Sequence, residues 1–251
     1  RSIWVTGVQT CALPIYPVYQ DELILGFQSM IDDKWSWGVR GIYRKLNNAI
    51  DDMEITSTGI VCDGEPVGAG FVMGNPGEPL TLLSDTNCDG ENDALVTIDT
   101  ANAGWAMFDE DGNYIGDVGY PKPKRDYKAL EFMVDRAWDD RWSFNATYTL
   151  SFSNGNTEGP VNSDTNFADA GRTEAFDNPW VNFGGVGYLP NDRRHQIKLR
   201  GAYAIGDAWE VGASLAVRSG RPISAFGSGN PFDDTVFDYM EIGRASCRER
   251  V

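Results

Sequence analysis

The stretch DDKWSWGVRGIY, residues Asp32–Tyr43, contains the pattern that decides the fold. A tight polar turn is followed by a Trp and then by strict alternation of apolar with small or polar residues. The pattern recurs in DDRWSFNATYTL (Asp139–Leu150) and in GDAWEVGASLAV (Gly206–Val217). Each copy follows another alternating run, so the sequence predicts three β-hairpins. Long alternating strands with an aromatic residue at a constant level are typical of an outer-membrane β-barrel.

The alternation also sets the limits of the predicted strands. Residues 22–31 pair with 35–44, residues 127–138 pair with 142–152, and residues 196–205 pair with 209–219. In each hairpin a Trp begins the second strand directly after the short turn. We therefore predict that the three Trp residues lie at one membrane interface, in the periplasmic aromatic girdle; they are Trp35, Trp142 and Trp209.

The connections between the predicted hairpins are long, whereas the turns within them are short. Residues 51–126 and 153–195 are both polar and far longer than the roughly 15 residues that a compact soluble domain tolerates without structure. A membrane barrel combines short periplasmic turns with long extracellular loops. We therefore expect both long segments to be extracellular. A soluble β-sandwich is the alternative, because its strands alternate too.

Composition limits the class of protein. The chain has 251 residues and a formal net charge of −16, which disfavours nucleic acid as a partner because phosphates require neutralising cations. No apolar run approaches the ~20 residues of a membrane-spanning helix, but strands can also cross a bilayer when they close into a barrel. With 28 Gly, 8 Trp and 12 Phe and little helical periodicity, the chain is predicted to be all-β.

Both ends of the chain resemble translated sequencing-library adapters. VTGVQTCALPI (Val5–Ile15) and IGRASCRERV (Ile242–Val251) match translations of adapter strands. We therefore expect residues 1–15 and 242–251 to be artefacts and residues 16–241 to be an internal piece of a longer protein.

Several segments resemble the TonB-dependent outer-membrane receptors of the Oar-like group. They are YPKPKRDYKALEFMVDRAWDDRWSFNATYTLS (Tyr120–Ser151), NGNTEGPVNSDT (Asn154–Thr165), YLPNDRRHQIKLRGAY (Tyr188–Tyr203) and SGRPISAFG (Ser219–Gly227). The resemblance implies a 22-stranded barrel with an N-terminal plug, located in the bacterial outer membrane. Six strands are too few to close a barrel of that size, so the chain is expected to be a partial barrel without plug or terminal strand.

The resemblance also implies the function and the partners. It implies movement of a bulky, unknown ligand across the outer membrane, outer-membrane lipid around the strands, and an inner-membrane TonB complex that acts through the plug. It does not identify ligand-binding residues in this sequence. Basic residues on the polar strand faces are expected to line a hydrated lumen or to face plug carboxylates; they are Arg40, Arg44, Lys198, Arg200 and Arg218.

Two cysteines lie outside the adapter-like ends. Cys62 and Cys88 both belong to the first long polar segment. A lone pair of loop cysteines indicates a disulfide in an oxidising compartment. Two unpaired thiols are the alternative.

The same segment contains a candidate calcium loop. Asp85, Asn87, Asp89, Gly90 and Asp93 spell D-x-N-x-D-G-x-x-D, and oxygen ligands at alternate positions suit a hard cation such as Ca²⁺. The Glu expected at position twelve of an EF-hand is replaced by Val96, which leaves a compact calcium loop or a solvated Asx- and Gly-rich turn. The sequence DEDGN (Asp109–Asn113) predicts the tip of a small hairpin.

The remaining candidate residues form a short basic cluster. Arg193, Arg194 and His195 precede a predicted strand and suit either an anionic ligand or pairing with loop carboxylates. Because His195 is the only His, a His-based triad or a metal-His site is excluded. We predict that the chain is not an enzyme. A secreted calcium-dependent β-sandwich binding module is the alternative function.

Overall fold

The computed structural model describes residues 15–159, 161–164, 174–182, 184–228 and 239–244. Most of the two adapter-like ends, residues 1–14 and 245–251, lies outside the described residues. The elements in the described ranges are β-strands, and their pairings are antiparallel, as predicted. Within those ranges the chain has no helix with the length and apolar character needed to cross a membrane.

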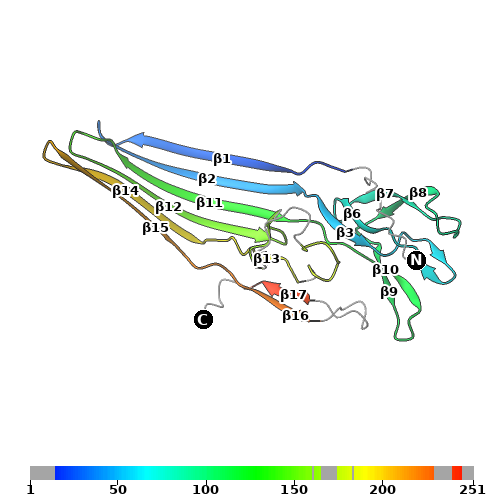
Figure 1. The fold of residues 1–251 in the computed structure, drawn as a ribbon. Coiled ribbons are helices and arrows are strands. Elements are labelled where there is room, and N and C mark those ends of the chain that lie inside the picture. The colour runs from blue at the N-terminus through cyan, green and yellow to red at the C-terminus, as the bar shows by residue number, and fades with distance from the viewer. Residues whose placement is uncertain (1–14, 160, 165–173, 183, 229–238, 245–251) are drawn as a thin grey trace.

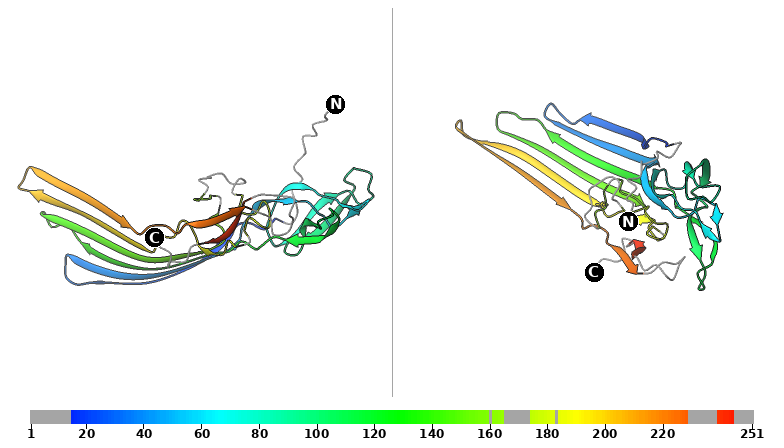
Figure 2. Two further views of the ribbon diagram at one scale, coloured as in Figure 1. Left: turned by 90° about the horizontal axis from the view of Figure 1, so that it is seen from below. Right: turned by 45° about the vertical axis from the view of Figure 1, so that its right-hand side comes forward.

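Six long strands form one curved sheet (Figures 1 and 2). Its order is β1–β2–β11–β12–β14–β15, so the strands follow one another in three hairpins joined side by side. The bounds are β1 (Tyr19–Met30), β2 (Trp35–Asn48), β11 (Arg125–Arg136), β12 (Trp142–Gly155), β14 (His195–Ile205) and β15 (Trp209–Arg218). The three predicted hairpins are confirmed, with ends that differ from the prediction by a few residues. The short strand β13 (Gly187–Tyr188) pairs with β12.

The first long segment is folded rather than irregular. It contains β3 (Asp51–Ile55), β4 (Val61–Cys62), β5 (Glu65–Pro66), β6 (Gly70–Gly74), β7 (Pro79–Ser84), β8 (Ala94–Asp99), β9 (Gly104–Phe108) and β10 (Tyr114–Gly119). These strands pair as β3–β6, β4–β5, β7–β8 and β9–β10. The hairpin predicted around DEDGN is present, because residues 109–113 connect β9 to β10.

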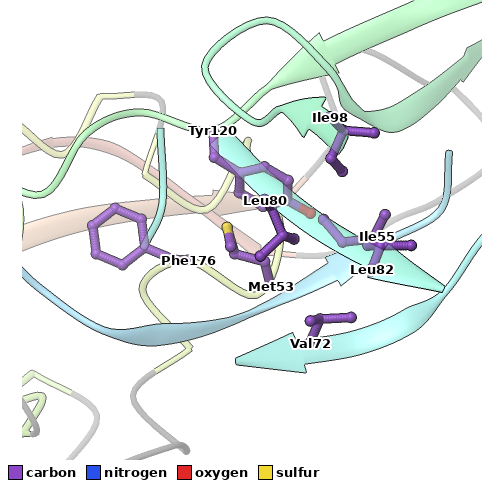
Figure 3. Packing of buried hydrophobic residues seen from close by; sticks show 8 residues of the cluster. All are labelled: Met53, Ile55, Val72, Leu80, Leu82, Ile98, Tyr120 and Phe176. Carbon is purple, nitrogen blue, oxygen red and sulfur yellow. The ribbon is translucent and has the colours of Figure 1, made fainter. Parts of the chain in front are cut away.

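We call residues 51–120 together with residues 174–182 the end module. It lies at the end of the sheet opposite the short hairpin turns (Figure 1). Its core is a cluster of buried apolar side chains on β3, β6, β7 and β8 and on the two connecting segments (Figure 3); the members are Met53, Ile55, Val72, Leu80, Leu82, Ile98, Tyr120 and Phe176. Apolar burial of this kind is the main stabilising contribution to a small fold.

Residues 174–182, which belong to the second long segment, contribute buried side chains to this core and to a second cluster beside it. Phe176 and Trp180 are fully buried, although they lie more than fifty residues after the last strand of the module. The Trp180 ring packs edge-on against Trp105, with 4.5 Å between the ring centroids. Backbone bonding adds to this contact, since Glu54 donates its N–H to the carbonyl of Asp177 at 2.9 Å. Residues 174–182 therefore belong to the same folded unit as the first long segment.

Tyr120 anchors the chain where it leaves the module for β11. Its side chain is buried, and its hydroxyl donates to the backbone carbonyl of Glu54. Burial raises the pKa of the Tyr120 hydroxyl. The phenol therefore stays protonated and acts as a hydrogen-bond donor at physiological pH.

The last strands, β16 (Ser224–Ser228) and β17 (Tyr239–Arg244), form a separate antiparallel pair.

Candidate functional site

The register of the six long strands produces one continuous apolar face. Phe27 is opposite Val39, which is opposite Phe132, and the row continues through Tyr148, Ile197 and Val217. The next row toward the turns contains Trp37, Val134, Ala146, Leu199 and Leu215. A register shift of one residue in one strand would move that strand's apolar side chains to the other face. Aligned alternation in six strands therefore builds one surface.

This apolar face is exposed in the described part of the chain. Leu25 is 68% exposed, and the aliphatic side chains along β15 are also more than half exposed at Val211 and Leu215. A contiguous apolar surface of this size is rare on a soluble monomer and indicates a membrane or a binding partner. In a β-sandwich the apolar face of one sheet packs against a second sheet. Among the described residues the clusters of buried apolar side chains lie in the end module, and this face does not carry such a two-sheet core.

Charged side chains border the apolar face at both ends. On β11 the residues that point to this face are Lys128, Leu130, Phe132, Val134 and Arg136. The two cations lie at the ends of the series, and the Lys128 ammonium lies 5.9 Å from the centre of the Tyr43 ring.

On β12 the apolar series runs from Trp142 to Phe152, which is ~33 Å along the strand and ~25 Å after a tilt of about 40°. That height matches the apolar band of an outer-membrane barrel.

The three predicted interface Trp residues lie at the same end of the sheet, next to the short turns (Figure 1). Trp35 and Trp142 contact each other edge to face, with 5.8 Å between their centroids. Trp209 begins β15, two strands beyond Trp142 in the sheet, and is 74% exposed. The structure thus brings two of the three Trp residues together. The register places Trp35, Trp142 and Trp209 in three successive rows at this end of the sheet. Their position at a membrane interface stays a prediction.

A charged cluster, which we call the turn clasp, joins the first two hairpins beside these rings. Its members are Lys34, Arg136 and Asp139. The Asp139 carboxylate accepts hydrogen bonds from Arg136 and from the Lys34 ammonium, the latter at 2.9 Å. These bonds, with the Arg136 bonds first in effect, hold the pKa of Asp139 well below its usual range. The clasp was not predicted from the sequence. The charged Arg136 in an otherwise apolar series of residues was the feature that could have indicated it.

The opposite face of the sheet is polar. Arg40 donates to Glu131 and Arg44 donates to Glu22 at 2.8 Å, so both arginines are paired across neighbouring strands. Thr149 lies in the row of Arg40 and Glu131, and Thr147 lies in the next row toward the short turns. The row between the two arginines contains Ile24, Ile42, Ala129 and Ser151. Lys198, Arg200 and Arg218 also belong to this face and are exposed. The five basic residues share this face, and their role in lining a lumen stays a prediction.

The structure joins Cys62 and Cys88 by a disulfide, with 5.6 Å between the Cα atoms. Cys62 ends β4, and Cys88 lies in the turn between β7 and β8. The link connects two hairpins of the end module. The oxidation state of these thiols in the protein remains a prediction for chemical test.

The candidate calcium residues share one turn but do not converge on a common point. Asp85 accepts backbone bonds from Asp89 and Gly90, the latter at 2.7 Å. Asp93 accepts bonds from the N–H and hydroxyl of Thr86, which lower the pKa of Asp93. Asn87 Oδ1 accepts the N–H of Asp89 at 3.1 Å. In the described part of the chain there is no group of three His, Cys, Asp or Glu side chains arranged to hold a metal.

The basic triplet before β14 divides among different partners. Arg194 lies 3.3 Å from the buried Asp192 carboxylate and stacks 3.9 Å from the centre of the Phe152 ring. His195 Nδ1 lies 2.8 Å from the Tyr148 hydroxyl on the apolar face. Arg193 faces a polar cavity on the other side of the sheet. Carboxylate pairing therefore accounts for Arg194 and leaves Arg193 for another role.

Comparison with known proteins links the chain to a transporter. Over 134 residues it is 34% identical to the TonB-dependent transporter Oar of Myxococcus xanthus. The match covers 49% of this chain and 13% of that protein, so the chain spans a small part of its relative. No family model matches the chain, and no solved structure matches it. This relative is described as a transporter, in agreement with the prediction that this chain is not an enzyme.

Proposed function

We propose that this chain forms part of the wall of a TonB-dependent transporter in the bacterial outer membrane. The observation that carries the proposal is the continuous exposed apolar face, which runs in register across six strands and has the polar residues on its reverse. Lipid would cover the apolar face, and a hydrated lumen would lie against the polar one. The similarity to a TonB-dependent transporter supports the same reading.

The open edges of the sheet support a larger barrel. Among the described residues β1 pairs only with β2, and β15 pairs only with β14. An unpaired edge this long is a liability that closed barrels remove. We therefore propose that further strands of the intact receptor pair with β1 and β15. The TonB complex and the ligand would act on that intact receptor through its plug.

We also propose that the end module and the segment around residues 153–195 lie outside the cell, and that the two adapter-like ends are not part of the natural protein. Resequencing the gene from adapter-trimmed reads tests the second proposal. Flanking sequence that continues the barrel beyond Tyr16 and Glu241 would support it, and the same residues 1–15 and 242–251 in the natural gene would contradict it.

Fractionation of the intact receptor tests the proposed location. We expect the receptor to fractionate with the outer membrane and to dissolve only in detergent. On a denaturing gel the unheated sample should migrate faster than the heated one, because a folded barrel resists the detergent. A soluble periplasmic or secreted protein whose migration does not change with heating would contradict the proposal. That result would favour the calcium-dependent β-sandwich module instead.

A further inference from the structure

A cavity of about 350 Å³ opens on the polar face of the sheet, near the end module. Residues from β1, β2, β11, β12 and β14 and from the segment before β14 surround it; those used below are Arg44, Arg125, Tyr127, Ser153, Asp192 and Arg193. Three of them are arginines in a chain with a net charge of −16. The cavity lining therefore contains three cations and one carboxylate, Asp192, in a chain that is acidic as a whole.

The three guanidinium groups differ in how far they are neutralised. Arg44 is paired with Glu22 at 2.8 Å and lies 5.5 Å from the centre of the Tyr127 ring. Arg125 donates to the backbone carbonyl of Glu158. Arg193 makes one long bond of 3.5 Å to the carbonyl of Asp192. In the described part of the chain neither Arg125 nor Arg193 forms an ion pair with a carboxylate.

The carboxylate in the cavity wall is already engaged. Asp192 is 2% exposed, and it accepts the backbone N–H of Ser153 at 2.8 Å. Its other oxygen lies 3.3 Å from Arg194. Asp192 therefore positions the chain before β14 and does not neutralise Arg193. Among the described residues Arg125 and Arg193 therefore keep N–H donors that no carboxylate oxygen accepts, and the fork of each guanidinium group matches the two oxygens of a carboxylate or phosphate.

We propose that this cavity binds an oxyanion group, carboxylate or phosphate, of the ligand that the transporter moves. The inference rests on the proposed function, since the polar face must be the lumen for a ligand to reach the cavity. Arg125 and Arg193 hold the oxyanion, while Arg44 and the Tyr127 ring form the side wall. The cavity lies at the end of the sheet next to the end module, so a ligand entering from outside the cell reaches it before the rest of the lumen.

Calorimetry on the intact receptor in detergent micelles tests the site, with citrate as the carboxylate probe and pyrophosphate as the phosphate probe, in buffer without divalent cations. We expect saturable binding of at least one probe that weakens as salt rises. Arg193→Gln and Arg125→Gln should each weaken binding by about tenfold, the loss of a charge-assisted hydrogen bond. Binding of citrate alone, pyrophosphate alone or both identifies which oxyanion the cavity takes.

Arg200→Gln is the matched control, because Arg200 is exposed on the same polar face of β14 and its change removes the same charge. It should change affinity by less than about twofold. Absence of saturable binding up to about 10 mM, or an equal loss in all three variants, would overturn the proposal. Heat-dependent migration of each variant is measured in parallel. If a variant inserts normally but does not bind, the result concerns the cavity alone. If the unmodified receptor does not insert into a membrane, the result contradicts the proposed function.

Discussion

The guanidinium group of Arg136 lies over the indole ring of Trp142, with its central carbon 3.7 Å from the ring centroid. The same group donates to both carboxylate oxygens of Asp139 and to the backbone carbonyl of Trp142. Arg136 is buried, and it points to the apolar face at the level of Trp35. One cation thus connects two aromatic rings and a turn carboxylate where the strands meet their short turns.

We predict that Arg136→Ala lowers the free energy of unfolding by about 2 kcal/mol, because a desolvated cation–π contact and buried hydrogen bonds are lost together. Urea unfolding of the intact receptor in detergent micelles measures this change. Arg141→Ala is the control, since Arg141 is exposed and its guanidinium group makes only long hydrogen bonds, of 3.3 Å, to the Tyr203 hydroxyl among the described residues. Equal effects of the two substitutions would contradict the importance of the clasp.

The clasp also predicts a pH dependence. Because Arg136 and Lys34 lower the folded pKa of Asp139 below its unfolded value, the stabilisation is complete above the unfolded pKa of about 3.9 and is lost as pH falls below it. The unfolding midpoint should therefore decline below about pH 4, and the decline should be shallower in Asp139→Asn. Identical acid profiles for the two proteins would rule out this contribution.

Two neighbouring positions on β12 test the two faces of the sheet. Ala146 lies on the apolar face and Thr147 on the polar face. Arg at position 146 should cost roughly 2–4 kcal/mol if it reaches the bilayer midplane, whereas Arg at position 147 should cost little because water can solvate it. Folding of both variants into lipid vesicles, followed by urea titration, gives the comparison. A larger cost at Thr147 would reverse the assignment of the faces.

The end module predicts a disulfide in the natural protein. We expect Cys62 and Cys88 to be recovered as linked peptides by mass spectrometry under non-reducing conditions. In the chain-entropy model, closing a loop with a sequence separation of 26 residues stabilises by about 3 kcal/mol. Alkylation of both thiols without prior reduction would show that they are unpaired.

Calcium binding by the turn at residues 85–93 is predicted to be weak, in the millimolar range typical of extracellular modules. Its oxygens already cap backbone N–H groups, so a cation must compete with the bonds from Thr86 and Gly90. A calcium titration of the intact receptor followed by NMR or tryptophan fluorescence measures the affinity. A response that persists in Asp89→Ala, or no response to calcium, would remove the site.

The sequence predicted the long sheet well because its strands carry their own signal. Alternation from Trp142 to Phe152 defines both the strand and its faces without reference to any other segment. The end module gave no such signal, since its strands have two to six residues and its core depends on distant side chains. Phe176 and Trp180 lie in a polar stretch, and only the folded chain shows that they pack beside Tyr120 and Trp105. The cavity was also hidden, because Arg44, Arg125 and Arg193 come from three separate segments.

The topology determines which positions suit a test of the membrane claim. Asn113, at the tip of the β9–β10 hairpin, and Glu91, in the turn before β8, are exposed on the end module. Asp33 and Asp207 are exposed in two of the short turns at the other end. Asp140, in the turn between β11 and β12, is less suitable because its φ of 66° would strain a new side chain. Asn156, directly after β12, is unsuitable because it is buried.

The most direct measurement is the labelling of single-Cys variants at these four positions in the intact receptor, with a reagent that does not cross the outer membrane. The account predicts that Cys at Asn113 and at Glu91 reacts on intact cells, while Cys at Asp33 and at Asp207 reacts only after the outer membrane is breached. Equal labelling of both pairs on intact cells would contradict a sheet that spans the outer membrane.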